Sequence, residues 1–280
     1  MRVLITGASG ATASQLLPML SDEPGNEIFC ADLAVPARPN WHQCDLADRD
    51  QIDALLSTVR PDRIYHLAGT FSNDYETDYR CNVAATKNLL DGCLALNLAC
   101  RTLLIGSAAE YGWVSAAENP VAEDHPLDPV NVYGLTKVFQ THLMKAYVAV
   151  HRLDLVMART FNLMGDGLSN QLFVGRLQEQ IRAYLSGQIA RIKVGNLDSK
   201  RDYIAIGQAA AHYRTIMNRG HSGEVYNVGS GESLPIRELL TRLLMTHGIP
   251  PEAIETLPAA NVNKLDIPDI YANIEKLLRL

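Results

Sequence analysis

Short apolar segments alternate along this chain with longer segments in which apolar residues recur every three or four positions. The short segments are rich in β-branched residues and have the length of buried strands, whereas the longer ones have the period of helices. Strands and helices that alternate in this way predict an α/β fold with a doubly wound, parallel sheet. The predicted strands are Arg2–Thr6, Glu27–Ala31, Arg63–Leu67, Thr102–Gly106, Asp154–Arg159 and Glu224–Val228.

Two long predicted helices, residues 83–98 and 134–150, are apolar on most of their sides. A helix that is apolar all round is usually buried on two faces. We expect one face of each to cover the sheet and the other to meet a second copy of the chain, which predicts a homodimer. The other predicted helices run from the first loop to Leu20 and over Asp48–Val59, Leu172–Leu185, Ile236–His247 and Ile270–Leu280.

The regular alternation ends near Phe161, and the pattern beyond it is looser. We therefore expect a core domain made of residues 1–160 together with about 204–228, which contain the strand that returns to the sheet. Residues 161–203 and 229–280 are expected to form a smaller lobe over the cleft of this domain.

Length and charge narrow the possible functions. A chain of 280 residues suits one large α/β domain, or a core domain with a smaller lobe. The 25 basic and 31 acidic residues give a net charge of −6, and the basic residues form no block. Nucleic acid is therefore not an expected partner.

The chain has five cysteines, Cys30, Cys44, Cys81, Cys93 and Cys100. They form no Cys-x-x-Cys pair and no metal-site spacing, which predicts buried thiols in a reducing compartment and no bound metal. His66 is expected to be a packed core histidine.

No apolar run reaches the roughly 20 residues that span a bilayer. Because Met1-Arg2 leads directly into a strand, no signal peptide is expected either, and a cytoplasmic location is predicted.

A turn rich in small residues separates the first predicted strand from the first predicted helix. Gly7 allows a tight turn there, and Gly10 lets backbone N–H groups approach a pyrophosphate at the start of the helix. Strand, glycine turn and helix in this order form the context that a dinucleotide-binding sequence requires, and they favour a Rossmann-type fold. The candidate cofactor-binding residues of the turn are Gly7, Ser9, Gly10, Ala11 and Thr12.

Asp32 follows the second predicted strand, at the distance from the glycine turn where dinucleotide-binding folds carry an acidic residue. A carboxylate there can accept hydrogen bonds from both ribose hydroxyls of NAD, and it repels the 2′-phosphate of NADP. Asp32 therefore favours NAD over NADP as the cofactor. The alternative is that Asp32 only caps a loop.

Tyr133 and Lys137 are spaced so that they share one face of a helix, about one turn apart. A phenol has an ordinary pKa of about 10, and a fixed ammonium nearby favours the phenolate, so Lys137 is expected to lower the pKa of Tyr133. Ser107 ends a predicted strand, where its hydroxyl would be accessible. The three groups can move a proton on a sugar-type oxygen while a cofactor moves a hydride. The alternative is a chance spacing, since Tyr-x-x-x-Lys is common.

Eight segments occur in an order typical of one superfamily: Thr6-Gly7-x-x-Gly10, Asp32, Asp45-Leu46, Leu67-Ala68-Gly69, Asn82-Val83, Ser107 before Tyr111-Gly112, Tyr133-x-x-x-Lys137 and Arg159-Thr160-Phe161-Asn162. Over nearly its full length the chain resembles the extended short-chain dehydrogenases/reductases, the NAD-dependent epimerase/dehydratase family. The resemblance implies an NAD(P)-dependent enzyme acting on a nucleotide sugar. It implies Tyr133 as the acid/base, Lys137 on the nicotinamide ribose and Ser107 on the reacting sugar oxygen.

The resemblance also implies further ligand contacts. For the cofactor they are Leu33, Asp45, Leu46, Leu67, Ala68, Gly69, Asn82 and Phe161, besides Tyr133 and Lys137. For the nucleotide sugar they are Ser107, Asn162, Phe173, Val174, Arg176, Asn196, Arg201 and Glu224. Arg201 is expected on the diphosphate, because a guanidinium binds phosphate through two hydrogen bonds; the alternative is a surface salt bridge with Asp202. Near the C-terminus, relatives often carry a further arginine that contacts the nucleotide, and Lys264 could substitute for it as a point charge.

The second half of the chain is most similar to reductases of GDP-linked 4-keto-6-deoxy-hexoses, which implies NAD(P)H-dependent reduction at carbon 4. Ala108 and Ala109 occupy positions where dehydratases of the family carry proton-transferring groups, so dehydration is disfavoured. Glu110 is expected to be structural. Two alternatives remain open. An NAD-dependent 4-epimerase needs the same three catalytic groups, and a non-catalytic dinucleotide-binding sensor could share the fold.

Overall fold

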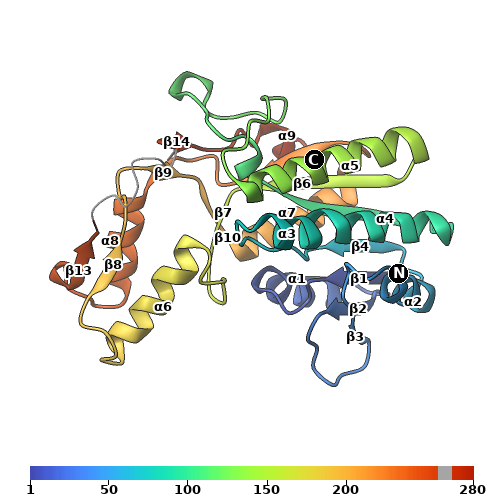
Figure 1. Ribbon diagram of the computed structural model, residues 1–280, viewed down its shortest axis with the longest axis horizontal. Helices are drawn as coiled ribbons and strands as arrows, with labels where there is room; N and C mark the ends of the chain where they lie inside the picture. The colour runs from blue at the N-terminus through green and yellow to red at the C-terminus, as the bar shows by residue number, and fades with distance from the viewer. Residues whose placement is uncertain (258–266) are drawn as a thin grey trace.

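A parallel sheet of seven strands forms the centre of the computed structural model, which describes residues 1–257 and 267–280 (Figure 1). The strand order is β11-β6-β5-β4-β1-β2-β3, so the order reverses between β1 and β4. In such sheets ligands bind outside the carboxyl ends of the strands at this reversal. The strands are β1 (Arg2–Thr6), β2 (Glu27–Asp32), β3 (Trp41–Gln43), β4 (Arg63–His66), β5 (Arg101–Ser107), β6 (Asp154–Thr160) and β11 (Val225–Val228). The predicted doubly wound fold is confirmed.

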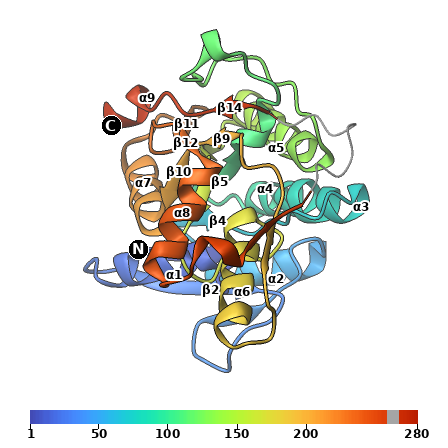
Figure 2. The same cartoon turned by 90° about the vertical axis from the view of Figure 1, so that its left-hand side faces the viewer.

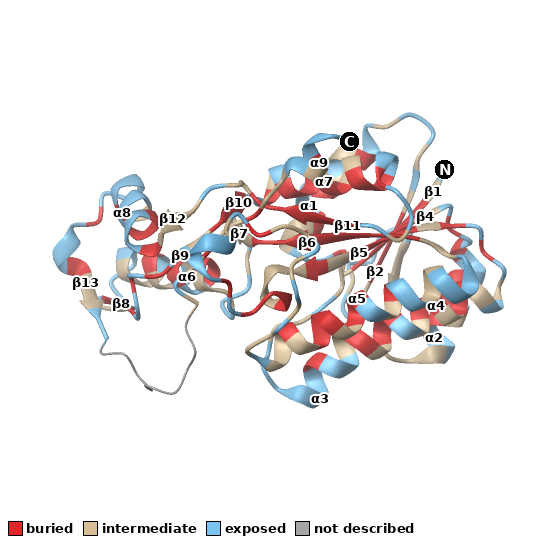
Figure 3. Ribbon diagram, turned by 90° about the horizontal axis from the view of Figure 1, so that it is seen from above, coloured by how far each residue is buried: buried red, intermediate tan, exposed pale blue. Residues whose placement is uncertain are grey.

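Helices cover both faces of this sheet (Figure 3). The helices α1 (Ala11–Ser21) and α7 (Ile206–Arg219) lie on one face, and α2 (Arg49–Val59), α4 (Ala85–Ala95) and α5 (Val132–His151) lie on the other. Side chains of a strand alternate between the two faces. In β1, accordingly, Val3 and Ile5 pack in the cluster that contains α1 and α7, whereas Leu4 packs with α2 and α4. Burial on both faces explains why the predicted strands are continuously apolar.

The two long predicted helices are present with small changes at their ends. The first is preceded by α3 (Tyr75–Asp78) and a π-helical segment, Tyr79–Ala84, before α4 begins. On α5 the inner face is buried, whereas Leu143 is half-buried and Val150 is 71% exposed on the outer side. Exposed polar residues, among them His142 and Lys145, lie on this outer side as well.

A smaller lobe extends from the carboxyl edge of the sheet and has its own apolar cluster (Figures 1 and 2). It contains α6 (Phe173–Leu185), β8 (Ile192–Val194), α8 (Ile236–Thr246), a turn at Pro251–Ala253 and β13 (Ile254–Thr256). Two short ladders connect it to the core: β7 (Asn162–Met164) pairs with β10 (Tyr203–Ala205), and β9 (Lys200–Arg201) pairs with β12 (Leu234–Pro235) and β14 (Asp269–Ile270).

The predicted helix over Ile270–Leu280 is wrong for most of its length. Ile270 belongs to β14, Ala272 forms a bridge with Val121, and only α9 (Glu275–Leu278) is helical. The backbone is extended because its hydrogen bonds go to neighbouring strands instead of to a helical turn. Leu277 of α9 packs in the sheet cluster with α1 and α7, so this end of the chain returns to the core.

Asp202 joins three segments where the lobe meets the core. Its side chain is fully buried and accepts hydrogen bonds from the backbone N–H groups of Ser230, Gly231 and Ala272, at 2.6, 3.0 and 3.1 Å. The Ser230 hydroxyl donates a fourth, at 2.7 Å. A buried carboxylate with four donors is a satisfied charge, and its loss would leave those donors unpaired.

We expect Asp202→Ala to lower the free energy of unfolding by about 3 kcal/mol or more, because several buried N–H groups lose their acceptor. Urea unfolding followed by circular dichroism measures this. Asp198→Ala is the matched control, since Asp198 is exposed and pairs only at the surface with Arg237, and it should cost less than about 1 kcal/mol. Equal losses in the two variants would contradict the role given to Asp202.

Candidate active site

The glycine turn after β1 lies directly against the end of β4. Gly7 has φ +68°, and a Cβ at this position would lie 2.6 Å from the backbone nitrogen of Ala68. Only glycine fits both the left-handed backbone and this approach. Gly10 then starts α1 without any side-chain cap, and the first turn, which begins with Ala11 and Thr12, contains no acidic residue. The first N–H groups of α1 are therefore available to an anionic group such as a pyrophosphate.

Asp32 ends β2 beside this turn. One carboxylate oxygen accepts a hydrogen bond from the Ser9 N–H at 2.9 Å, and the other accepts one from the Leu33 N–H at 2.7 Å. The carboxylate therefore does cap a loop, as the alternative interpretation requires. Each oxygen can still accept a further hydrogen bond, so the contacts also leave room for a ribose hydroxyl. The side chain of Leu33 is 60% exposed next to it.

The other predicted cofactor residues lie at the same edge of the sheet. Asp45 follows β3 and pairs with Arg80 at 2.6 Å. Asn82 is fully buried, accepts a hydrogen bond from the Thr70 N–H at 2.9 Å and donates one to the Thr136 hydroxyl at 3.1 Å. Asn82 thus connects the loop after β4 to α5. The remaining residues are Leu67, Ala68 and Gly69 after β4, buried Leu46 after β3, and buried Phe161 after β6.

Ser107, Tyr133 and Lys137 come together at the carboxyl end of β5. The Lys137 ammonium donates to the Ile105 carbonyl at 2.9 Å, and its nitrogen lies 5.8 Å from the centre of the Tyr133 ring. Helix α5 approaches the turn after Ser107 so closely that a Cβ at Gly134 would lie 2.4 Å from the Ala109 carbonyl oxygen. A side chain at position 134 would therefore collide with this turn, which explains the glycine next to Tyr133. The three predicted catalytic side chains share one site.

The expected lowering of the Tyr133 pKa is wrong. Burial raises the pKa of Tyr133 to about 12, although the hydrogen bond with Ser107 opposes this shift and the carboxylates of Glu110 and Asp78 add to it. Burial also lowers the pKa of Lys137 to about 8. Loss of hydration disfavours both charged forms, and it is the largest cause of both shifts. The phenol is consequently protonated at neutral pH.

Glu110 fixes the position of Ser107 from within the core. Its carboxylate accepts a hydrogen bond from the Ser107 N–H at 2.8 Å and one from the Thr141 hydroxyl at 2.6 Å. It also forms an ion pair with Arg159 at 3.0 Å, and both side chains are almost completely buried. The expectation that Glu110 is structural is confirmed. Arg159, the first residue of the Arg159–Asn162 motif, is therefore a core residue. The contact between Glu110 and Ser107 could have been predicted from the sequence, because a Ser-x-x-Glu spacing is typical of a capping box.

Three predicted substrate residues line a pocket of 230 Å³ in the smaller lobe: Phe173, Arg176 and Asn196. Val174 does not join them with its side chain, which is 2% exposed and packs with Tyr203 and Leu239. Only its backbone, in the first turn of α6, is left for a ligand.

Two further predicted substrate contacts, Asn162 and Arg201, lie on the short strands that connect the lobe to the core. Asn162 lies on β7 and donates to the Asp202 carbonyl at 3.0 Å. Arg201 donates to the carbonyls of Lys200 and Ile267, at 2.7 and 2.5 Å. Lys264 lies outside the described residues.

Glu224 lies away from the other predicted substrate residues. It precedes β11, so it belongs to the amino edge of the parallel sheet, whereas Ser107 ends β5 at the carboxyl edge. Its carboxylate pairs with Lys276 at 2.6 Å. The prediction is wrong because the residue and the motif after it, Asn227 to Gly229, are separated by the length of the strand.

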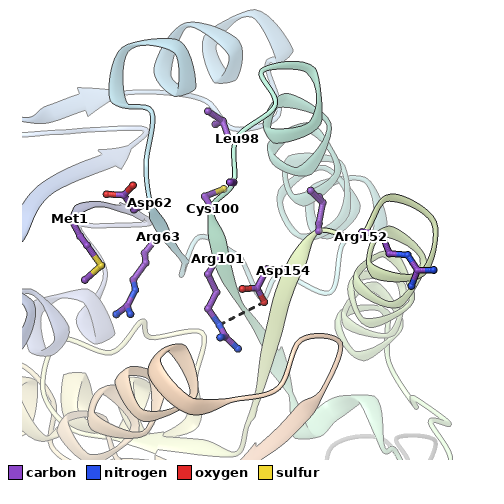
Figure 4. A pocket seen from close by; sticks show the side chains of 10 residues that line it. Met1, Asp62, Arg63, Leu98, Cys100, Arg101, Arg152 and Asp154 are labelled. Atoms are coloured by element: carbon purple, nitrogen blue, oxygen red, sulfur yellow. Dashed lines mark ion pairs between the residues drawn. The ribbon is translucent and has the colours of Figure 1, made fainter.

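A pocket of 440 Å³ also opens at the amino edge (Figure 4). Its charged side chains include both signs, and Arg101 lies 3.9 Å from Asp154 across it. This pocket is on the side of the sheet opposite the glycine turn. In the described part of the chain, no group of three or more metal-ligating side chains occurs, and no helix is long and apolar enough to cross a membrane.

Comparison with known proteins agrees with this geometry. Residues 3–229 match the model of the NAD dependent epimerase/dehydratase family, and the chain belongs to this family. GDP-6-deoxy-D-mannose reductase of Pseudomonas aeruginosa is 30% identical over 249 residues, which are 86% of this chain and 79% of the relative. GDP-6-deoxy-D-talose 4-dehydrogenase of Aggregatibacter actinomycetemcomitans is 26% identical over 285 residues, 100% of this chain and 91% of the relative.

Solved structures extend the similarity. RMD from Pseudomonas aeruginosa, complexed with NADPH, superposes with a TM-score of 0.84 at 26% identity, covering 100% of this chain and 92% of that chain. UDP-glucose 4-epimerase of Thermus thermophilus, in complex with NAD, gives a TM-score of 0.87 at 23% identity over 100% of this chain and 92% of that chain, which shows the shared fold. The protein is thus an NAD(P)-dependent enzyme of a family of oxidoreductases and epimerases that modify nucleotide sugars.

We expect Glu110→Ala to lower the free energy of unfolding by about 3–5 kcal/mol, because Arg159 becomes a buried charge without a partner. Urea unfolding measures the loss. Glu118→Ala is a matched control: Glu118 forms the same kind of capping box with Ser115, but in an exposed turn. That variant should lose about 1 kcal/mol or less. A Glu110 variant as stable as the control would show that the buried pair is dispensable.

Proposed function

We infer that this protein reduces carbon 4 of a nucleotide-linked 4-keto-6-deoxy-hexose with NAD(P)H. The observation that carries the proposal is the convergence of Ser107, Tyr133 and Lys137 at the carboxyl end of β5, next to an uncapped glycine turn. The turn fits a dinucleotide because Gly7 allows the close approach and the first N–H groups of α1 face an anion.

The cofactor, when bound, supplies the hydride. The chain then has to position the sugar and provide a proton. Tyr133 donates the proton to the oxygen at carbon 4, and Ser107 donates a hydrogen bond to the same oxygen. Lys137 holds the ribose next to the reacting ring and, as an ammonium, compensates the negative charge that Tyr133 acquires.

The protonation state of Tyr133 is the one in which it can act as a general acid. With a pKa raised to about 12, the phenol carries its proton at neutral pH and is in the form that a reduction consumes. An oxidation would need the phenolate first. A general acid has to carry its proton when the reaction begins, and it works best when its pKa lies near the working pH, so the proposal also requires that the pKa of Tyr133 falls when the ligands bind.

Dehydration is disfavoured by the turn that follows Ser107. Ala108 and Ala109 carry no group that exchanges a proton, and Glu110 is buried against Arg159. Its carboxylate is already engaged by three partners in the core. Elimination of water from the sugar would therefore lack an acid and a base at this position.

The nucleotide is proposed to bind over the smaller lobe. Phe173, Arg176 and Asn196 line its pocket and offer an aromatic face, a cation and an amide. Asn162 and Arg201 lie between this pocket and the core, on β7 and β9. GDP is the proposed nucleotide because two relatives that match most of the chain are named for GDP-linked deoxyhexoses.

A 4-epimerase is the second candidate, because UDP-glucose 4-epimerase of Azospirillum brasilense is 26% identical over 99% of this chain. An epimerase oxidises and then reduces carbon 4 with the same three groups, so it turns over with catalytic NAD⁺. A reductase consumes NAD(P)H in proportion to product. Product analysis with and without added reduced cofactor separates the two.

The proposed assembly is a cytoplasmic homodimer in which α4 and α5 of two copies pack together. The outer face of α5 carries the half-buried Leu143 and the exposed Val150. Sedimentation of the wild type and of Val150→Lys tests this interface.

Tyr133→Phe should lower kcat by about 10² to 10⁴, because the general acid is lost. Binding of the reduced cofactor should stay close to that of the wild type, since the ring and its contact with Phe71 remain. Turnover measured by the absorbance of the reduced nicotinamide, together with fluorescence titration of the cofactor, checks both parts. Undiminished kcat would remove Tyr133 from the mechanism.

NADH should be preferred over NADPH, because the negative charge of the Asp32 carboxylate beside the glycine turn would repel a 2′-phosphate. The ratio of kcat/KM for the two cofactors measures the preference, and Asp32→Asn should reduce it by removing the negative charge. The relative complexed with NADPH makes this a sharp test. An NADPH preference in the wild type would show that Asp32 only caps its loop.

A further inference from the structure

A continuous chain of buried polar side chains connects Lys137 to the strand that precedes the glycine turn. Lys137 donates to the Gln140 side-chain oxygen at 3.1 Å, and the Gln140 amide nitrogen donates to the Thr86 hydroxyl at 2.8 Å. The same hydroxyl lies 3.1 Å from Nε2 of His66, whose Nδ1 lies 2.8 Å from the Thr6 hydroxyl. Gln140, Thr86, His66 and Thr6 are all fully buried. They belong to four elements: α5, α4, β4 and β1.

Only one arrangement of protons satisfies this chain. An ammonium can only donate, so the oxygen of the Gln140 amide must face Lys137 and its nitrogen must face Thr86. The Thr86 hydroxyl has one hydrogen, and it goes to the Asn82 carbonyl at 2.7 Å, which can only accept. Thr86 must then accept from His66, which places the imidazole proton on Nε2. Nδ1 is left to accept from the Thr6 hydroxyl.

The charge on His66 agrees with this arrangement. Burial, with the nearby charge of Lys137, lowers the pKa of His66 to about 3, so the ring is neutral throughout the physiological range. A neutral imidazole has one donor and one acceptor, and the chain uses both. The expectation of a packed core histidine is confirmed, but the contacts of the ring reach the catalytic lysine.

We propose that Gln140 is a positioning residue for Lys137. Thr86 donates to the Asn82 carbonyl and accepts from the Nε2–H form of His66, so it can only accept from Gln140 and thereby fixes the amide with its oxygen toward the ammonium. Among the described residues, Lys137 has two acceptors, the Gln140 side-chain oxygen and the Ile105 carbonyl. A buried ammonium depends on such acceptors for its charge. Gly69 bounds the same space, since a Cβ there would lie 3.3 Å from the Lys137 nitrogen.

The other groups that face Lys137 are few. Asp78 at the end of α3 and Glu110 in the turn after β5 are carboxylates that favour its charged form, while burial opposes it. Tyr133 and His66 are neutral at pH 7. Because burial lowers the pKa of Lys137 to about 8, its positive charge is present below that pH and is lost as the pH rises through it. A substitution that changes an acceptor of Lys137 should therefore change the pH at which the lysine loses its charge.

The test replaces Gln140 and follows Lys137 directly. In protein labelled with ¹³C at the lysine Cε, with the Lys137 signal assigned by Lys137→Met, Gln140→Leu should lower the titration midpoint by about one pH unit, since one acceptor of a charged group is lost. Gln140→Glu should raise the midpoint, because a carboxylate replaces the amide oxygen. Tyr65→Phe is the control: Tyr65 is a fully buried neighbour of His66, and the described residues provide no partner for its hydroxyl. Its midpoint should equal that of the wild type.

A second measurement needs no substitution. Nitrogen chemical shifts of His66 in the wild type should show a neutral ring with the proton on Nε2 between pH 6 and 9. A proton on Nδ1, or an unchanged Lys137 midpoint in a folded Gln140→Leu protein, would overturn the proposal. Only the kinetic part of the inference rests on the proposed function. If Lys137 takes part in the reaction, the pH above which kcat falls should follow the Lys137 titration midpoint in each variant. Midpoints that move while kcat does not would instead count against Lys137 in the reaction.

Discussion

The Lys137 ammonium is buried between the central sheet and α5, and an ion in such a place is costly unless its hydrogens find acceptors. The Ile105 carbonyl and the Gln140 amide provide two. Asp78 and Glu110 add negative charge nearby. Each of these carboxylates is held in turn, Asp78 by the loop after β4 and Glu110 by the core. Keeping one cation charged in the interior thus constrains the helices and strands around it.

The same contacts arrange the surface on which we propose that the reaction takes place. Glu110 holds the Ser107 N–H, and Asp78 holds the N–H groups of the loop at residues 72 and 73. The Asn73 side chain of that loop reaches the Tyr133 N–H at 3.4 Å. The proposed function and the stability of the core therefore depend on a shared set of buried polar groups. In the proposed function, the catalytic groups are fixed from the core, whereas the pocket proposed for the nucleotide is formed by the smaller lobe.

Much of this could be predicted from local sequence patterns. Buried parallel strands are apolar throughout, a turn such as that at Gly7 requires glycine, and a four-residue spacing places Tyr133 and Lys137 on one helix face. The predictions that were wrong concern properties that depend on the tertiary structure. The pKa of Tyr133 follows from desolvation, which no spacing reveals. Glu224 was misplaced because it precedes its strand, at the end opposite the site. Residues 270–274 were wrongly predicted as helix because their backbone pairs with neighbouring strands. The Gln140–His66 connection joins four elements and has no local signal.

The central claim is that a sugar carbonyl and a nicotinamide ring meet beside one phenol. A crystal structure of the protein with reduced cofactor and an unreactive GDP-linked hexose tests it most directly. The account predicts that nicotinamide carbon 4 lies about 3–3.5 Å from hexose carbon 4. It also predicts that the hydroxyls of Tyr133 and Ser107 lie within hydrogen-bonding distance of the oxygen on that carbon. A complex in which the ring lies elsewhere, or in which the sugar presents a different carbon to Tyr133, would contradict it.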